Sequence, residues 1–276
     1  MKSLLVHLDA SPRAAVRLSM AQALAKHYQA EVAAVYGVLA SLLATPWVAT
    51  EGVTYAMSAL VDLDRELRER TRKVYDTAAI QGEMRWIEGG ESPYHTLLMH
   101  ALTSDLLVVG QPDSDDATTG PLPPDLVPSL IIDSGRPTLV VPKAGSFEPV
   151  AGRVLIAWKR TREAGRAITA ALPWLRQAKV VNVASRPDDA DDLADEFDQG
   201  SSIEHWLRLH GVTGVIDLHR LGPGEVGQEL MWLGKDTESE LLVMGCYGHS
   251  RTREWVLGGA SRSVLQGMTL PVLMVH

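Results

Sequence analysis

The sequence predicts an α/β protein made of two tandem copies of a doubly wound domain, each with a five-stranded parallel sheet. The chain of 276 residues repeats its own pattern once, and each copy alternates short apolar strands with amphipathic helices. The hydrophobic fraction of 46% and the charged fraction of 22% are typical of globular domains. A length of this order suits about two such domains.

The internal repeat is clearest at two apolar segments of each copy. Asp105–Gly110 matches Glu240–Gly245, and each is followed by a terminal apolar run, 137–141 in the first copy and 271–275 in the second. The interval from the glycine that ends the first segment to the proline that opens the second is 27 residues in one copy and 26 in the other. Such self-similarity indicates a duplication of one fold.

Each copy is predicted to alternate strands and helices from end to end. In the first copy we predict strands at 3–8, 31–37, 83–87, 105–109 and 138–141, and helices at 11–28, 57–80, 92–103 and 124–133. In the second we predict strands at 153–158, 178–184, 213–218, 240–244 and 271–275, and helices at 161–176, 200–210, 224–237 and 259–267. Runs such as Leu106–Val109 are apolar throughout, as expected of strands buried on both faces of a parallel sheet.

The domain boundary is predicted in a segment punctuated by glycine and proline, which divides the chain into domains 1–143 and 152–276. The first copy is longer than the second, and the extra length is assigned to 39–56. The apolar residues of that segment either pack in the core or contact a partner.

Composition excludes several classes of protein. The net charge of −8 argues against a nucleic-acid-binding protein, and no apolar run approaches the length of a membrane span. The first residues do not form a secretory signal, and the lone cysteine, Cys246, cannot form an intrachain disulfide. We therefore expect a cytoplasmic protein. The nine histidines lack the spacing of a helical metal site, so no bound metal is predicted from them.

A glycine-containing loop follows the fourth predicted strand of the second copy. It reads Gly245-Cys246-Tyr247-Gly248, and after nine more residues Gly258-Gly259-Ala260-Ser261 opens a helix. Glycines let backbone N–H groups approach a ligand, and a helix N-terminus attracts phosphate. Alternatively, the glycines only form a tight turn. Cys246 is either a small loop residue or, beside Arg251, a reactive thiol.

This pattern, Gly-x2-Gly-x9-Gly before a helix and a short last strand, resembles the universal stress protein family. The resemblance covers nearly the whole chain twice, so the chain resembles a tandem member. It implies Rossmann-like domains related to the adenine nucleotide α-hydrolases, many of which bind ATP or AMP. It also implies pairing of last strands, here 138–141 with 271–275 inside one chain as a pseudo-dimer, with a further homodimer as an open alternative.

The first copy departs from the family pattern at its loop. Asp9 stands where nucleotide-binding members carry an aspartate, but Gln111 and Pro112 follow Gly110 in place of the glycine pattern. The acidic residues Asp113, Asp115 and Asp116 would repel phosphate, and Asp125–Ser129 opens the next helix without a glycine. We therefore expect no nucleotide in this copy, and Asp9 is then interpreted as a helix cap.

The second copy keeps the glycines but places Lys159 where the family aspartate would lie. A lysine cannot accept a hydrogen bond from an adenine amino group, so it either pairs with phosphate or lies in solvent. The resemblance assigns a base contact to the backbone of Val183. The nucleotide-binding residues we predict are Val183, Gly245, Gly248, Arg251, Gly258, Gly259, Ala260 and Ser261.

The expected function is therefore that of a stress-response protein that binds ATP or AMP, with Mg²⁺ accompanying the nucleotide, in its C-terminal domain. No catalytic constellation is recognisable, so we expect a binding protein and not an enzyme, with slow, incidental ATP hydrolysis left open. The alternative is a nucleotide-free interaction or dimerisation module, which Lys159 and Gly259 favour.

Overall fold

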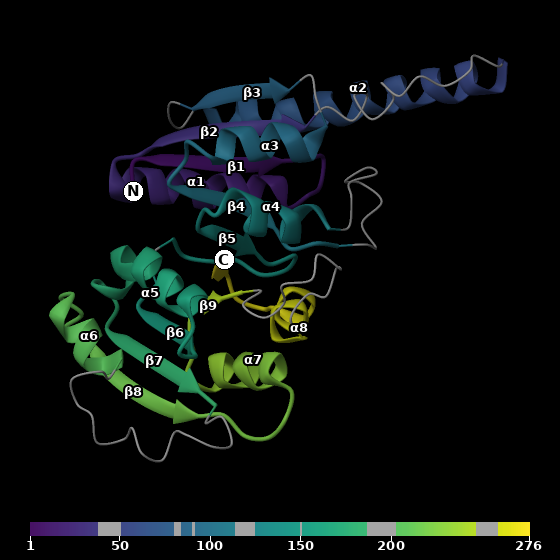
Figure 1. Ribbon diagram of the computed structural model, residues 1–276. Helices are drawn as coiled ribbons and strands as arrows, with labels where there is room; N and C mark the ends of the chain where they lie inside the picture. Colours follow the sequence, from purple (N-terminus) through teal and green to yellow (C-terminus); the bar gives the residue numbers. More distant parts are fainter. Residues whose placement is uncertain are drawn as a thin grey trace. The chain divides into compact units, whose positions relative to one another are not determined.

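The computed structural model describes residues 1–37, 51–79 (backbone only for 51–60), 84–89, 92–113, 125–149, 151–186, 203–246 and 259–276. They form two compact units, unit 1 (Met1–Lys143) and unit 2 (Ala144–His276). Both consist of strands that alternate with helices along the chain (Figure 1).

Unit 1 contains one parallel sheet. Its elements in chain order are β1 (Ser3–Leu8), α1 (Ala14–Tyr28), β2 (Glu31–Gly37), α2 (Glu51–Ala79), β3 (Arg85–Gly89), α3 (Pro93–Ala101), β4 (Leu106–Gly110), α4 (Leu126–Ser134) and β5 (Thr138–Val141). The strand order is β3-β2-β1-β4-β5, and these pairings are parallel. The chain winds outward from β1 to β3 and then returns to the other side of β1 with β4.

Unit 2 repeats this arrangement. Its elements are β6 (Arg153–Trp158), α5 (Arg162–Leu175), β7 (Val180–Ser185), α6 (Ile203–Leu209), β8 (Val215–Arg220), α7 (Val226–Asp236), β9 (Leu241–Gly245), α8 (Gly259–Gly267) and β10 (Val272–Val275). The strand order is β10-β9-β6-β7-β8, again parallel. The predicted fold, two tandem doubly wound α/β domains, is confirmed.

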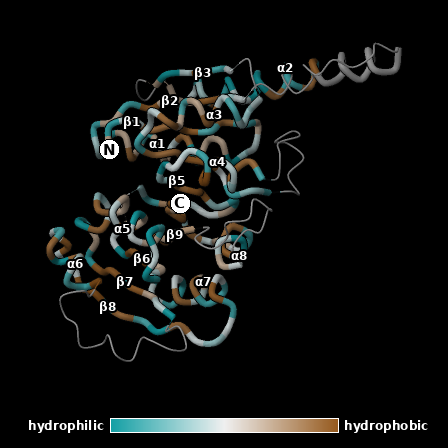
Figure 2. The backbone as a smooth tube through the Cα atoms, viewed as in Figure 1, coloured by the Kyte–Doolittle hydropathy of each residue, from teal (hydrophilic) through white to brown (hydrophobic). Residues whose placement is uncertain are grey.

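The central strands of each unit form its core because their side chains are apolar on both faces. All four residues of Leu106–Val109 have no exposed surface, and Leu242 and Val243 of β9 match them. Figure 2 shows hydrophobic residues along the central strands, with hydrophilic ones on the outer turns of the helices. Burial of this kind stabilises each unit by roughly 25 cal/mol for every Å² of apolar surface.

Several predicted boundaries differ from the structure by two or more residues. β3 and β8 end at Gly89 and Arg220 because pairing with the neighbouring strand extends each past its apolar run. Helix α2 begins at Glu51, so residues 51–56 of the segment assigned to 39–56 are helical, and residues 39–50 of that segment lie outside the described residues. Among the residues described, no helix combines the length and apolar character needed to cross a lipid bilayer.

Candidate functional site

Each sheet has a switch point at its centre, where consecutive connections leave in opposite directions. In unit 1 this point lies between the carboxyl ends of β1 and β4, and in unit 2 between those of β6 and β9. Ligands of open parallel sheets bind at such points because the diverging loops leave a crevice there. The two switch points are therefore the places to compare.

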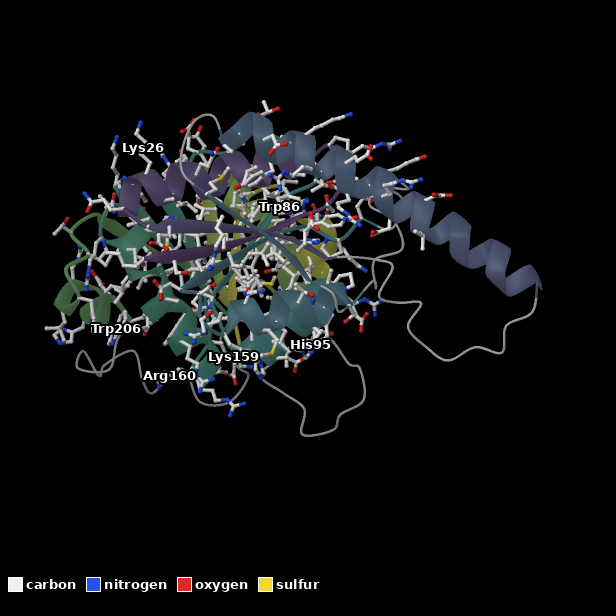
Figure 3. All side chains as sticks on the ribbon, turned by 90° about the horizontal axis from the view of Figure 1, so that it is seen from above. Lys26, Trp86, His95, Lys159, Arg160 and Trp206 are labelled. Atoms are coloured by element: carbon white, nitrogen blue, oxygen red, sulfur yellow. The ribbon has the colours of Figure 1, made fainter. Side chains whose placement is uncertain are left out.

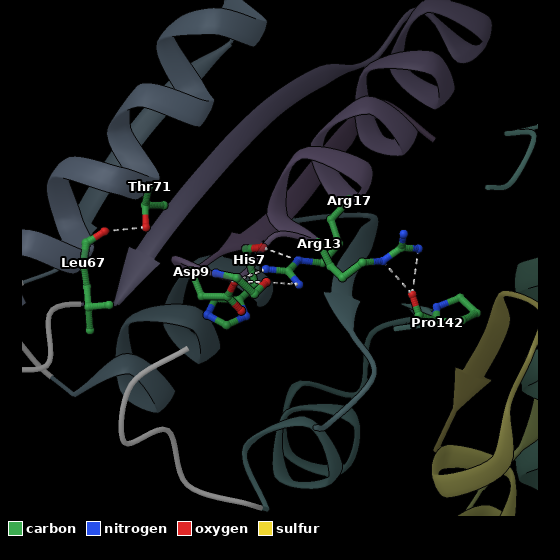
Figure 4. Close-up of polar contacts among 8 residues, drawn as sticks. His7, Asp9, Arg13, Arg17, Leu67, Thr71 and Pro142 are labelled. Atoms are coloured by element: carbon green, nitrogen blue, oxygen red, sulfur yellow. Dashed lines mark hydrogen bonds and ion pairs between the residues drawn. The ribbon is translucent and has the colours of Figure 1, made fainter. Parts of the chain in front are cut away.

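In unit 1 an arginine of helix α1 fills the switch point. The guanidinium of Arg17 lies 2.5 Å from Asp9 Oδ1 and donates through Nε to the carbonyl oxygen of His7 at 3.1 Å (Figure 4). Asp9 Oδ1 also accepts hydrogen bonds from the backbone N–H and the hydroxyl of Ser11, at 3.0 and 2.5 Å. The side chains of Arg17 and Asp9 are only 3% and 10% exposed, so the pair belongs to the interior.

Two residues at the end of β4 also help to fill the switch point. A Cβ added at Gly110 would lie 2.5 Å from Nη1 of Arg17, so the glycine makes room for the guanidinium. The next residue, Gln111, is buried, and its side-chain oxygen accepts a hydrogen bond from the backbone of Lys143 at 3.0 Å. The crevice in which a doubly wound sheet usually holds a ligand is occupied here by the protein's own charged and polar groups.

The electrostatics of the cluster follow from burial and the ion pair. Burial alone would raise the pKa of Asp9, but the positive charge of Arg17, the interaction with His7 and the hydrogen bonds from Ser11 and Arg17 together outweigh it and lower this pKa to about 2. Burial lowers the pKa of His7 to about 4, although Asp9 opposes that shift. At neutral pH the cluster therefore holds an ionised aspartate, an arginine and a neutral histidine.

The interpretation of Asp9 as a helix cap is wrong. Helix α1 begins at Ala14, and the residue that precedes it is Arg13, so Asp9 lies before the helix and pairs with Arg17. Sequence reasoning missed Arg17 altogether. The available signal was its spacing, because Arg17 lies three residues after Ala14 and four before Ala21, on the helix face that is buried.

At the switch point of unit 2 the corresponding segment is cationic. Lys159 follows β6 directly, as Asp9 follows β1, and Arg160 and Arg162 come next. Lys159 and Arg160 are exposed, and the side chain of Arg162 is 70% exposed. Figure 3 shows Lys159 and Arg160 next to one another at the periphery of the molecule. At the position directly after the first strand, a positive charge thus replaces the carboxylate of Asp9.

Nothing equivalent to Arg17 is available on helix α5. Arg17 lies nine residues after the last residue of β1 and three after the first residue of α1. In unit 2 the residue nine after the end of β6 is Ala167, and the residue three after the start of α5 is Gly165. Both residues are small and uncharged. Helix α5 therefore cannot close its switch point with a guanidinium in the way that α1 does.

Gly245, predicted to contact phosphate, ends β9 and packs against helix α5. A Cβ at this position would lie 2.4 Å from the backbone nitrogen of Ala164 and from the backbone carbon of Glu163. Its missing side chain is therefore needed for the close approach of two backbones, which is a packing reason for glycine that operates with or without a ligand.

Cys246 follows Gly245 and is 2% exposed. Its backbone N–H donates to the carbonyl of Val275, and its carbonyl oxygen lies 3.1 Å from Nδ1 of His276. Burial, with the nearby carboxylate of Glu163, raises the pKa of the thiol far above its usual range. A thiol that stays protonated is a poor nucleophile, so these features argue against a reactive cysteine.

Glu163 is the anionic group at this end of unit 2. Its side chain is 3% exposed and hydrogen-bonded to Arg162. Burial acts to raise its pKa, but the hydrogen bond from Arg162 contributes to a net lowering, so the carboxylate stays ionised. The paired arginine offsets its charge.

Helix α8 begins with residues of decreasing exposure. Gly259 is exposed and Ala260 half-buried, whereas Ser261 is 4% exposed and faces the interior. Among the residues that the structure describes, which resume at Gly259 after a gap, no atom lies within 4 Å of a Cβ placed at Gly259.

The start of α8 is held in place by helix α7. Ser263 donates a hydrogen bond of 2.6 Å to Glu225, whose carboxylate also accepts from the backbone N–H groups of Gly227 and Gln228 at the start of α7. A Cβ at Gly227 would lie 2.6 Å from the hydroxyl of Ser263, so this glycine lets the two helices approach closely. These contacts fix the position of the α8 N-terminus.

The remaining predicted residues are placed as follows. Val183 lies in β7, two residues before its end, with its side chain buried and β6 and β8 on either side. Gly248, Arg251 and Gly258 lie outside the described residues. In the part of the chain that the structure describes, no group of three or more His, Cys, Asp and Glu side chains is placed to hold a metal ion.

Of the acidic residues predicted to repel phosphate in unit 1, Asp113 lies 3.2 Å from the ammonium nitrogen of Lys143. Asp115 and Asp116 lie outside the described residues.

Comparison with known proteins gives no match to any family model and no match to a curated protein. Comparison with solved structures gives matches along the whole chain. A universal stress protein from Archaeoglobus fulgidus DSM 4304 is 15% identical with a TM-score of 0.68, and the match covers 99% of this chain and 95% of that one. A functionally unknown protein from Pseudomonas aeruginosa PAO1 is 17% identical with a TM-score of 0.58, covering 100% and 92%. The chain therefore has the fold of the tandem universal stress proteins over its whole length.

Proposed function

We propose that this chain is a tandem universal stress protein whose unit 2 binds an adenine nucleotide, ATP or AMP, at the carboxyl edge between β6 and β9. The observation that carries the proposal is the contrast between the two switch points. In unit 1 the Arg17–Asp9 ion pair fills the crevice, whereas in unit 2 Lys159 and Arg160 are exposed, and among the described residues no atom lies within 4 Å of a Cβ placed at Gly259.

In this proposal the phosphates lie at the start of α8. The first backbone N–H groups of a helix have no partner within the helix and point along its positive dipole end, so they bind anions. Gly259 and Ala260 supply such groups, and Lys159 and Arg160 neutralise the phosphate charge from the end of β6. We assign Gly245, Gly248, Arg251, Gly258 and Ser261 to the same site, and Mg²⁺ would accompany ATP through its phosphates.

Base recognition in this proposal differs from that of relatives with an aspartate after the first strand. Lys159 cannot accept a hydrogen bond from the adenine amino group, so the base is held through backbone groups near Val183 and through stacking or apolar contact. Without this directional hydrogen bond, the site should discriminate weakly between adenine and other bases. An exposed contact is worth about 1 kcal/mol, so the affinities for the different bases should differ by no more than about tenfold.

The same proposal makes the protein a binding module in a stress response and not an enzyme. The described part of unit 2 offers Glu163 as a buried carboxylate, but its lowered pKa makes it a weak base, and it is thus poorly suited to act as a general base near neutral pH. A cytoplasmic location and pairing of 138–141 with 271–275 within the chain stay predictions.

Isothermal titration calorimetry with ATP, AMP and ADP tests the proposal. We expect one nucleotide bound per chain, and loss of at least tenfold in affinity in Gly259→Asp. That carboxylate would repel phosphate, yet it has room for its side chain and suits a helix N-terminus, so the fold should tolerate it. Gly267→Asp, with the same charge change at the other end of α8 and equally open space, is the matched control.

The alternative, a nucleotide-free interaction module, predicts no heat with any of the three nucleotides at millimolar concentration. Release of phosphate from Mg²⁺-ATP that is abolished by Gly259→Asp would instead make unit 2 an ATPase, contrary to the proposal.

A further inference from the structure

Strand β8 is an edge strand whose outer side is left unpaired by the described residues. It lies at one end of the strand order of unit 2 and pairs only with β7 on its inner side. Proteins usually protect such edges, because unpaired N–H and C=O groups invite pairing with another strand. β8 instead exposes two large apolar side chains, Val215 at 57% and Leu218 at 64%.

The hydrogen-bond register identifies the residues that face outward. The N–H groups of Val215 and Leu221 donate to carbonyls of β7, at 2.9 and 2.8 Å. Because the N–H and C=O of one residue in a strand point to the same side and alternate along the chain, those of Ile216, Leu218 and Arg220 point away from the sheet. The outer edge of β8 therefore presents three residues ready for pairing, with Leu218 in the middle.

An apolar surface adjoins this edge. Trp232 of helix α7 is 64% exposed and lines a shallow groove of about 410 Å³ together with Leu218 and Leu233. His219, Arg220, Glu229 and Asp236 border the groove with charged and polar groups. A groove lined by both apolar and charged side chains, with an exposed tryptophan among them, is typical of a protein interface.

We propose that the occupant of this surface is a second copy of the chain, whose β8 pairs with β8 in an antiparallel, two-fold symmetric arrangement centred on Leu218. Leu218 then lies opposite Leu218 of the second copy, and Ile216 lies opposite its Arg220. These are the residues whose backbone groups point outward, so each opposed pair exchanges two hydrogen bonds. The Leu218 side chains meet next to both Trp232 side chains.

Charge complementarity selects this register. Asp217 lies opposite His219 of the second copy, twice by symmetry, and the ring of His219 is held at Nε2, 2.9 Å from Asn182 Oδ1. A shift by two residues in one direction places Asp217 opposite Asp217, and in the other direction it places His219 opposite His219, so both shifts lose the Asp217–His219 pairs. Like charges directly opposite one another destabilise an antiparallel ladder.

Disulfide trapping tests the register. Directly opposed residues of a hydrogen-bonded antiparallel pair have Cα atoms about 5.5 Å apart, within the range that a disulfide spans. Leu218→Cys should therefore form a covalent dimer under mild oxidation. Val215→Cys is the control, because it is similarly exposed but lies three residues from the axis, and its partner is about 20 Å away at the rise of a strand. The native Cys246 is buried and should not interfere.

Sedimentation equilibrium or light scattering at about 100 μM tests the association itself. The native chain should have twice the mass of the 30.0 kDa chain. Leu218→Lys should restore the single-chain mass, whereas Leu209→Lys, on an exposed leucine of α6, should leave the dimer intact. A native mass of one chain, a dimer unaffected by Leu218→Lys, or equal trapping at positions 215 and 218 would overturn the proposal, and none of these results depends on nucleotide binding.

Discussion

The two units share one fold but treat the same position in opposite ways. Unit 1 places a carboxylate, Asp9, after its first strand and closes the switch point over it with Arg17. Unit 2 places Lys159 there, and its helix α5 carries only small residues at the positions that correspond to Arg17. The comparison shows that one sheet topology accommodates a switch point filled by a buried ion pair in unit 1 and exposed cationic side chains at the corresponding position in unit 2.

The largest expected effect on stability comes from breaking the Arg17–Asp9 ion pair of unit 1. Arg17→Met should lower the free energy of unfolding of unit 1 by about 3–5 kcal/mol, because it leaves Asp9 buried and unpaired. Asp9→Asn combined with Arg17→Met should recover part of the loss. Urea titrations read by pulsed hydrogen exchange report each unit separately.

The matched control for that change lies in unit 2. Arg153 pairs with Glu238 at 3.7 Å, with side chains 47% and 79% exposed. Arg153→Met should cost about 1 kcal/mol or less, because water screens an exposed pair. Equal losses in the two variants would show that the Arg17 pair is not a buried structural element.

Acid should destabilise unit 1 through the same cluster. The pKa of His7 is lowered to about 4, so its contribution to stability is complete above its unfolded value of 6.5 and is lost as the pH falls toward 4. Asp9, with its pKa lowered to about 2, loses its contribution as the pH falls from 3.8 toward 2. The His7 shift alone corresponds to about 3 kcal/mol.

Urea titrations of unit 1 at pH 7 and pH 5 measure this effect. His7→Gln, which does not titrate, should flatten the dependence between those values. An unchanged pH dependence in His7→Gln would assign the acid sensitivity to another group.

Two glycines of unit 2 should respond differently to alanine. Gly245→Ala should destabilise the unit by about 1–3 kcal/mol, because its methyl group would overlap the backbone of α5, which cannot rotate away. Gly259→Ala should be neutral or stabilising by up to about 1 kcal/mol, because its Cβ meets open space in a helix. Thermal unfolding of the two variants checks this, and a large loss in Gly259→Ala would mean that the position is packed.

The smallest effect concerns the thiol. Because its thiol is buried and stays protonated, Cys246 should react with a thiol reagent only as fast as unit 2 opens. Bound nucleotide should lower this rate, because a ligand that binds the folded unit makes opening rarer. Fast labelling of the native protein would contradict its burial.

The sequence predicted the fold well because the repeat and the apolar strands are properties of short segments. β4 and β9 were recognisable from four or five residues each, and their burial on both faces follows from composition. The buried Arg17–Asp9 ion pair of unit 1 could not be predicted from a short segment. Whether an arginine in a helix is solvated or buried depends on what the tertiary structure places beside it. Arg17 is interior only because Asp9 and Gly110 lie next to it.

Gly245 illustrates the same limit at the candidate site. Its lack of a side chain correctly predicted a close approach by another group, but the sequence could not distinguish a ligand from the backbone of α5. Strand β8 is a further case, since its alternation of apolar and charged residues predicts a strand but not that it lies at the edge of the sheet.

The central claim is that nucleotide binds in unit 2 and not in unit 1. Hydrogen–deuterium exchange of the native chain, with and without saturating ATP, tests it most directly because it resolves the two units. We expect added protection at the end of β6, the start of α5 and the first turn of α8, with exchange around Asp9 and Arg17 unchanged. Protection confined to the Asp9–Arg17 region would contradict it.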